Sequence, residues 1–247
     1  VVDGVVKIGL SKDEVRSLSE KKDVIKLSRN DLAYAISCRK TGATTVAATM
    51  ILAASANIKV FATGGVGGVH LDAEKTFDVS ADLQELAQTP VTVISAGPKA
   101  ILDLPKTLQV LETLGVPVVT FGQDELPAFW SRSSGLRSPI RMNSAEEIAR
   151  SQLIREALSI PGGQLVANPI PAYAEIPFQE ILPIIKKAHL EANKENISDK
   201  NLTPFLLEKV FNLTDGASLN ANIELVKNNA SLACKVASSL ITEKSRL

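Results

Sequence analysis

The stretch Ile58-Lys-Val-Phe-Ala-Thr-Gly-Gly-Val-Gly-Gly-Val-His70 decides the fold, because an apolar strand ends there in a glycine-rich turn. The pattern returns at Val91-Thr-Val-Ile-Ser-Ala-Gly-Pro-Lys99, where a second strand ends in a glycine turn and a lysine. Apolar strands that alternate with helices predict an α/β fold, a mainly parallel sheet with helices on both faces. Ligands of such α/β/α sandwiches bind beyond the carboxyl ends of the strands. We therefore expect both turns at the binding edge.

The rest of the chain continues this alternation. A capping box at Ser11-Lys-Asp-Glu14 predicts a helix to about Lys21, and Asn30 or Asp31 caps the next one. No repeat or linker interrupts the pattern, so we expect a single domain over residues 1–247, with 135–143 as a candidate mobile loop. Further helices are predicted at 44–56, 81–88, 108–114, 143–159, 178–195, 203–213 and 219–240, and further strands at 5–8, 24–27, 116–120 and 165–167. Residues 41–43 read as a turn before the helix at 44–56.

The composition excludes several classes of protein. Lys plus Arg and Asp plus Glu both number 27, so the net charge is zero, which argues against a binder of nucleic-acid polymers or membrane surfaces. Cys38 and Cys234 show neither metal spacing nor a disulfide framework, which predicts two buried thiols in a reducing compartment. No apolar run is long enough to span a bilayer.

Both ends of the chain carry an expectation. The chain opens at Val1 with a strand-like segment and no leader, so we expect an N-terminal portion to be missing. It closes on Ser245-Arg246-Leu247, which is close to the Ser-Lys-Leu peroxisomal address. The alternative is an ordinary helix end in an otherwise cytoplasmic protein.

The glycine loop has two interpretations. Gly64, Gly65, Gly67 and Gly68 would allow positive φ and bring backbone N–H groups close to an anion. The loop matches neither the dinucleotide fingerprint of a Rossmann-like module nor the P-loop. Glycines that merely allow close strand packing are the alternative.

A carboxylate segment follows the loop. Asp78 and Asp82 are spaced to share a helix face, although Asp78 could precede the helix, and Ser80 is a natural N-cap whose helix start would face an anion. A lone carboxylate completed by water suits Mg²⁺ or Mn²⁺. Simple capping by Asp78 and Ser80 is the alternative.

Two lysines and a histidine complete the candidates. Lys99 lies between apolar segments without polar neighbours, and desolvation would keep its amine neutral and nucleophilic. Lys26 lies on a strand or its tip, and either lysine could be an ordinary solvated charge. His70 is as compatible with anchoring the loop as with acting as a base.

Taken together, these segments resemble the pseudouridine-5′-phosphate glycosidase family, also called indigoidine-synthase-A-like, over essentially the whole chain. The matching segments are 24–29, 42–50, 60–70, 77–83, 95–103, 111–117, 168–171, 203–207 and 228–230. The resemblance implies reversible cleavage of the C–C bond of pseudouridine 5′-phosphate into uracil and ribose 5-phosphate. It implies a covalent Schiff-base type adduct between a lysine and C1′ of the opened ribose.

The resemblance assigns roles to individual residues. Lys99 matches the nucleophile, and Asp78 matches the ligand of a divalent metal, usually Mn²⁺. Residues matching substrate contacts are Lys26, Val46, Ser80, Ala81 and Asp82. A homotrimer is also implied.

The chain departs from the family pattern at three places. The Glu-Ser-Thr-like motif with the general acid is not found, Leu71 replaces the usual Arg, and Asn30 stands where Arg is more common. Two alternatives therefore stay open: a truncated or non-catalytic paralogue that binds sugar phosphate, and a related C-glycosyl synthase.

Overall fold

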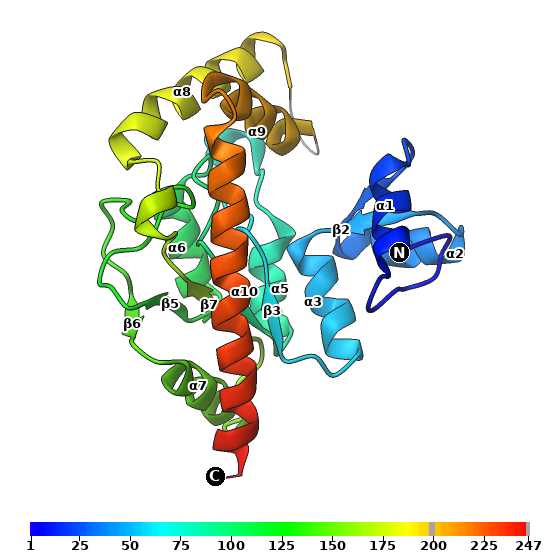
Figure 1. The fold of residues 1–247 in the computed structure, drawn as a ribbon, viewed down its shortest axis with the longest axis vertical. Coiled ribbons are helices and arrows are strands. Elements are labelled where there is room, and N and C mark those ends of the chain that lie inside the picture. Colours follow the sequence, from blue (N-terminus) through cyan, green and yellow to red (C-terminus); the bar gives the residue numbers. More distant parts are fainter. Residues whose placement is uncertain (198–200, 246–247) are drawn as a thin grey trace.

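A five-stranded parallel sheet forms the centre of the protein. The computed structural model describes residues 1–197 and 201–245. The strands lie in the order β3-β4-β7-β5-β6, and every neighbouring pair is parallel. This confirms the predicted α/β class (Figure 1). The strands are β3 (Val60–Ala62), β4 (Thr92–Ser95), β5 (Val118–Phe121), β6 (Ile140–Met142) and β7 (Gln164–Ala167).

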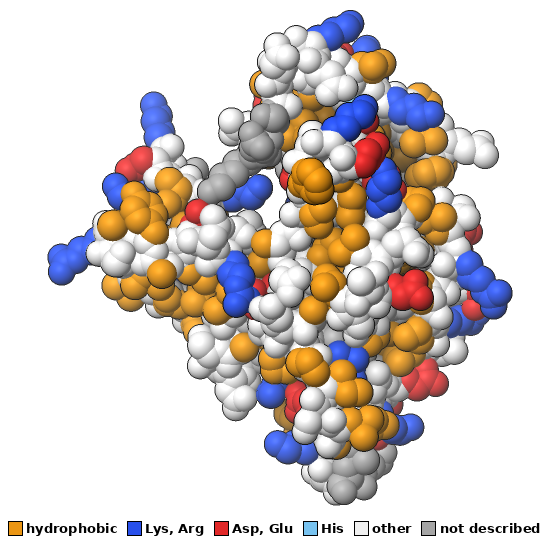
Figure 2. Space-filling model, turned by 180° about the vertical axis from the view of Figure 1, so that it is seen from behind, with side chains coloured by type: hydrophobic (Ala, Val, Ile, Leu, Met, Phe, Trp, Pro, Cys, Tyr) orange, Lys and Arg blue, Asp and Glu red, His pale blue; other side chains and the backbone are white. Residues whose placement is uncertain are grey.

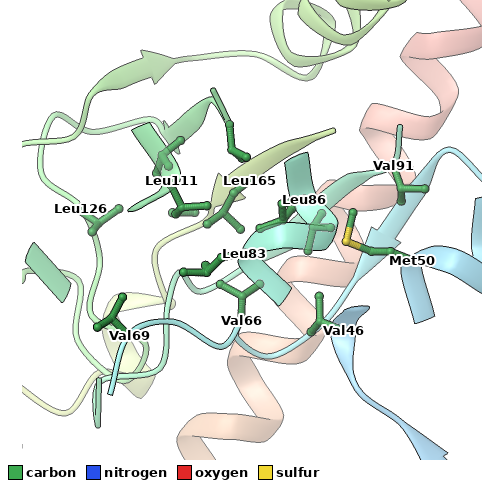
Figure 3. Packing of buried hydrophobic residues seen from close by; sticks show 14 of the residues in the cluster. Val46, Met50, Val66, Val69, Leu83, Leu86, Val91, Leu111, Leu126 and Leu165 are labelled. Atoms are coloured by element: carbon green, nitrogen blue, oxygen red, sulfur yellow. The ribbon is translucent and has the colours of Figure 1, made fainter. Parts of the chain in front are cut away.

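Helices cover both faces of this sheet. Successive strand residues point to opposite faces, so Val93 and Leu165 belong to one apolar cluster, while Ile94 and Val166 belong to another. The first cluster packs under α3 (Val46–Ser55), α5 (Ala81–Gln88) and α6 (Leu104–Thr113) (Figure 3). The second packs under α7 (Ala145–Ala157) and α10 (Ala217–Lys244).

A third apolar cluster lies beyond the carboxyl ends of the strands. It joins the turn after β4, through Ala96 and Ile101, to α8 (Phe178–Lys194), α9 (Leu202–Leu213) and the start of α10. The short elements α4 (Ala73–Thr76) and η2 (Ala172–Ala174) lie in the connecting loops. This cluster supports the edge at which a ligand is expected.

Residues 1–44 form a small lobe beside the main sheet, connected to it through α3 (Figure 1). Its two strands pair in parallel with each other, and Lys26 lies opposite Ala43. The capping box of Ser11 is confirmed. The elements of the small lobe are α1 (Lys12–Glu20), β1 (Ile25–Leu27), η1 (Arg29–Asp31), α2 (Leu32–Ser37) and β2 (Gly42–Thr44).

Three local predictions were wrong. The strand expected at 5–8 is absent: Val5 makes only an isolated antiparallel bridge with Val2, and its side chain is exposed. Residues 42–44 form β2 instead of a turn, and the loop expected at 135–143 contains the edge strand β6. In each case the partner strand decides the outcome, and local sequence does not specify a partner.

The cysteine prediction was also wrong. Cys38 and Cys234 are both free, as expected, but both are exposed. Cys38 follows the last residue of α2, and Cys234 lies on α10. The frequent burial of free cysteine is a statistical tendency, and here each position faces away from the core.

Arg246 and Leu247 of the predicted peroxisomal address lie outside the described residues. Among residues 1–197 and 201–245, no helix is both long and apolar enough to traverse a bilayer.

We predict that Leu165→Ala lowers the free energy of unfolding by about 2–5 kcal/mol, because Leu165 is fully buried in the central strand β7. Leu158→Ala is the matched control, since that leucine is 66% exposed. Denaturant unfolding of both variants measures the difference. Equal losses would contradict the placement of the core.

Candidate active site

Two loops meet at the carboxyl edge of the sheet. β3 and β4 are parallel neighbours, so the glycine loop after Ala62 and the turn after Ser95 leave the sheet at the same edge. The N–H of Val66 donates to the carbonyl oxygen of Gly97 at 3.2 Å, and the N–H of Lys99 donates to that of Val66 at 3.1 Å. These bonds place Lys99 directly beside the glycine loop.

Close approach, and not positive φ, explains the glycines of the loop. None of Gly64, Gly65, Gly67 and Gly68 has positive φ, so the expectation of left-handed backbone was wrong. A Cβ atom on Gly67 would lie 2.2 Å from Oγ of Ser80, and one on Gly65 would lie 2.7 Å from the ring of Phe129. Gly65, Gly67 and Gly68 therefore pack where a side chain would collide, whereas Gly64 has room for one.

Asp82 fastens the loop to two helices. Its carboxylate is almost fully buried; Oδ1 accepts from the N–H of Ala47 at 2.9 Å and Oδ2 from the N–H of Gly67 at 2.8 Å. Its own N–H donates to Oγ of Ser80, which is the N-cap of α5 as predicted. The first turn of α3, the glycine loop and the first turn of α5 thus share one anchor.

Asp78 lies before α5 and does not share a helical face with Asp82. The segment is extended: Val79 bridges to Val69, and the N–H of His70 donates to the carbonyl oxygen of Asp78 at 3.0 Å. Its carboxylate therefore projects from an extended segment beside the helix start.

A cavity of ≈ 710 Å³ occupies the space between the small lobe and the carboxyl edge. Seen from behind, the small lobe is set off from the body by a notch (Figure 2). The cavity brings together every residue to which the family resemblance assigned a role. These residues are Lys26, Val46, Asp78, Ser80, Ala81, Asp82 and Lys99. Their individual roles stay predictions.

The amine of Lys99 is in a desolvated position. Burial lowers the pKa of Lys99 below its usual value, and the nearby charge of Lys26 lowers it further, while the carboxylate of Asp82 acts in the opposite direction. A larger share of neutral amine is therefore present near pH 7 than for a solvated lysine. This is the electronic condition for attack on a carbon centre.

His70 is buried beside Asp78. Its Nδ1 lies 3.9 Å from Oδ2 of Asp78, which is beyond hydrogen-bond distance, and makes no other hydrogen bond within the described part of the chain. Burial lowers the pKa of His70, although Asp78 acts to raise it. The ring is therefore held neutral at the cavity wall, which leaves both interpretations of His70 open.

The donor set at Asp78 fits a weakly held hard cation. No group of three His, Cys, Asp or Glu residues that could hold a metal occurs among the residues described. Asp78 is partly exposed to the cavity, so one carboxylate could bind Mg²⁺ or Mn²⁺ with water and substrate oxygens filling the other positions. A metal cage made only of protein ligands does not fit these residues.

Lys99 also lines a second cavity, of ≈ 330 Å³. Thr44, Thr45, Val46 and Lys99 line both cavities. The second one also has an amide at its wall, Asn222 of α10, whose Oδ1 accepts from Nε1 of Trp130 at 2.8 Å. Sequence reasoning missed Asn222, because only the packing of α10 against the loop between β5 and β6 brings it to the site.

Comparison with known proteins identifies relatives over almost the full chain. Residues 1–239 match the family described as indigoidine synthase A like protein. A pseudouridine-5′-phosphate glycosidase of Jannaschia sp. (strain CCS1) is 60% identical over 98% of this chain and 80% of its own length. The enzyme of that name from Paracoccus denitrificans (strain Pd 1222) is 57% identical over 98% of this chain and 80% of its own length.

Solved structures show the same architecture. The prealnumycin C-glycosynthase AlnA in complex with ribulose 5-phosphate matches with a TM-score of 0.93 at 30% identity, over 100% of this chain and 82% of that one. An indigoidine synthase A-like protein of Thermotoga maritima matches with a TM-score of 0.89 at 34% identity. The match covers 97% of this chain and 79% of that one. The α/β fold is therefore shared with solved proteins.

We predict that Gly67→Ala lowers both stability and activity, because its Cβ would force Ser80 and Asp82 away from the loop. The expected loss is about 1–3 kcal/mol in the free energy of unfolding. Gly64→Ala is the matched control for stability, since its nearest neighbours would be 3.5 Å away. Thermal unfolding that ranks the two variants equally would contradict this account of the loop.

Proposed function

The chain belongs to the indigoidine synthase A-like family, and from this premise we propose that it is an enzyme that cleaves the C–C glycosidic bond of pseudouridine 5′-phosphate. Uracil and ribose 5-phosphate are the products. Relatives that carry this activity in their names are 57–60% identical over 98% of the chain. The observation that carries the chemistry is the half-buried amine of Lys99 between two cavities.

In the proposed reaction, the neutral amine of Lys99 attacks C1′ of the ribose. The C1′–O4′ bond breaks, and the ring oxygen takes up a proton. The nitrogen then loses a proton and forms a C=N bond to C1′, while the electrons of the C1′–C5 bond pass to uracil and C5 is protonated. Water hydrolyses the resulting iminium, which releases ribose 5-phosphate and restores the amine.

The two cavities fit the two halves of such a substrate. The larger cavity offers Lys26 and the start of α5 at Ser80 and Ala81, which favour a phosphate. The smaller one offers an amide at Asn222 and the rings of Phe61 and Phe129, which favour a planar base with carbonyl groups. Lys99 lies between them, where C1′ joins sugar and base.

We propose Mn²⁺ or another divalent cation as the metal, with Asp78 as its protein ligand. When bound, it offsets charge on substrate oxygens. The homotrimer rests on the family resemblance, and the peroxisomal address rests on residues 245–247; both are proposals.

A second candidate, a C-glycosyl synthase, is favoured by the match to the C-glycosynthase AlnA over the whole chain. The same lysine chemistry would run toward bond formation. Incubation with ribose 5-phosphate and either uracil or an aromatic acceptor distinguishes the two candidates by the C-glycoside that forms. No product with either acceptor would favour the non-catalytic alternative.

We predict that borohydride, added with ribose 5-phosphate, fixes the sugar to Lys99 by reducing the iminium to a stable secondary amine. Mass spectrometry of peptides locates the adduct. Lys99→Met should give no adduct and should lose at least about a thousandfold in kcat. Lys59→Met removes an exposed lysine at the amino end of β3. It should retain the adduct on Lys99 and the parent kcat. An adduct on another lysine would refute the assignment.

Lys99→Met should also be at least as stable as the parent at pH 7. Burial lowers the folded-state pKa of Lys99, so its protonation destabilises the fold. This cost is complete below the folded-state pKa and disappears as pH rises through the unfolded value of about 10.4. The stability gained from Lys99→Met should therefore shrink with rising pH in denaturant unfolding. The measured quantity is the free energy of unfolding of Lys99→Met minus that of the parent. A difference that is larger at pH 10 than at pH 7 contradicts the prediction.

We predict that Asp78→Asn weakens Mn²⁺ binding by at least about tenfold, since an amide is a poorer ligand for a hard cation than a carboxylate. Electron paramagnetic resonance of free Mn²⁺ measures the affinity without relying on turnover. Asp72→Asn is the control, because that carboxylate is exposed and pairs with Lys75. Equal affinity of all three proteins would remove Asp78 from the metal site.

A further inference from the structure

The small lobe supplies one wall of the larger cavity. Val24, Ile25, Lys26 and Ala43 line this wall, and Asp78 and Ser80–Asp82 line the wall that belongs to the main body. The distance between the walls depends on how the small lobe is held. Figure 1 shows the lobe to one side of the sheet, with α3 as its connection.

One salt bridge joins the two walls behind the cavity. Nη1 of Arg29 lies 2.5 Å from Oε2 of Glu85 on α5. It links the small lobe to the chain beyond α3, whereas the salt bridges of Lys7, Arg16 and Lys21 stay within the lobe. Neither Arg29 nor Glu85 lines the cavity itself.

The glutamate requires this partner. The side chain of Glu85 is 1% exposed, and its other oxygen, Oε1, accepts from the hydroxyl of Thr89. A buried carboxylate that loses its cation keeps the full cost of desolvation. Arg29 is half-exposed, so the pair is asymmetric: the helix fixes Glu85, and Glu85 fixes Arg29.

Arg29 and Glu85 each lie close in sequence to a residue of one cavity wall. Arg29 lies three residues after Lys26, just past β1, and Glu85 lies three residues after Asp82, about one helical turn along α5. The bond therefore ties the strand that presents Lys26 to the helix that begins at the Ser80–Asp82 turn.

We propose that Arg29 and Glu85 are positioning residues that fix the width of the cavity between Lys26 and the start of α5. The inference rests on the proposed function for its kinetic consequence only. A substrate that contacts both walls binds more weakly when the distance between the walls changes. The attack by Lys99 depends instead on the position of Lys99 at the carboxyl edge of the main sheet.

Kinetics with pseudouridine 5′-phosphate give the first test. Arg29→Met should raise KM about tenfold, with kcat changed less than about threefold, and Arg29→Lys should recover most of the loss. Arg150→Met is the matched control, because Arg150 also pairs with a buried glutamate, Glu243, but on α7 and α10 away from the cavity. It should lose stability without a change in KM. Should Arg29→Met fold poorly, the double variant Arg29→Met/Glu85→Leu removes both charges and should show the same rise in KM.

A distance measurement tests the inference without turnover. The only two cysteines, Cys38 in the small lobe and Cys234 on α10, are both exposed and accept spin labels without engineering. Diluting the labelled protein into unlabelled protein suppresses label-to-label distances between different copies of the chain. The Cys38–Cys234 distribution should broaden or shift in Arg29→Met/Glu85→Leu and stay unchanged in Arg150→Met.

The two measurements separate the possible failures. No turnover by the parent protein overturns the proposed function and leaves the distance distribution to decide the inference. An unchanged distribution in the double variant overturns the inference, whatever happens to KM. A KM that stays at the parent value while the parent is active also overturns it, and leaves the proposed function intact.

Discussion

The carboxylate of Asp82 is the interaction on which the rest of the site depends. It accepts N–H groups from α3 and from the glycine loop, and it lies at the start of α5, so three distant segments meet at one buried anion. A buried carboxylate is tolerated only where donors satisfy it, and here backbone donors do so. Any contact of Asp82 with substrate must use the lone pairs that remain. These bonds give Asp82 a structural role at the cavity, and its proposed contact with substrate comes in addition to that role.

The same anion sets the balance at Lys99. Burial lowers the pKa of Lys99 by more than the charge of Asp82 raises it. The amine therefore lies near a carboxylate and still has a lowered pKa. No hydrogen bond joins Lys99 Nζ to another side chain among the described residues. An amine that must attack carbon, form an iminium and return needs an environment in which both charged and neutral forms are accessible. The partial burial of Lys99 beside two cavities supports the proposed reaction in this respect.

The parts of the fold with local signals were predictable from sequence, and the parts that depend on partners were not. Ser80 and the apolar spacing of α5 gave that helix its observed bounds, and the strand-turn pattern placed Lys99 beside the glycine loop. The pairing of β2 with β1 and the edge position of β6 depend on strands distant in sequence. Asn222 has no local signal, because it reaches the site only through the packing of α10. Of the two interpretations of the glycine loop, close packing is confirmed and positive φ was wrong; local sequence could not decide between them, because the atoms that crowd the glycines come from distant segments.

The structure separates two departures from the family pattern that looked equivalent in sequence. Leu71 is exposed and is not among the residues that line the larger cavity. Asn30 does line it, on the same wall as Lys26. A neutral amide in place of a guanidinium removes one fixed positive charge from that wall and keeps hydrogen-bond donors. Among the small-lobe residues that line the cavity, Lys26 is the only cation, so the proposed contact of this wall with a phosphate depends on the placement of β1.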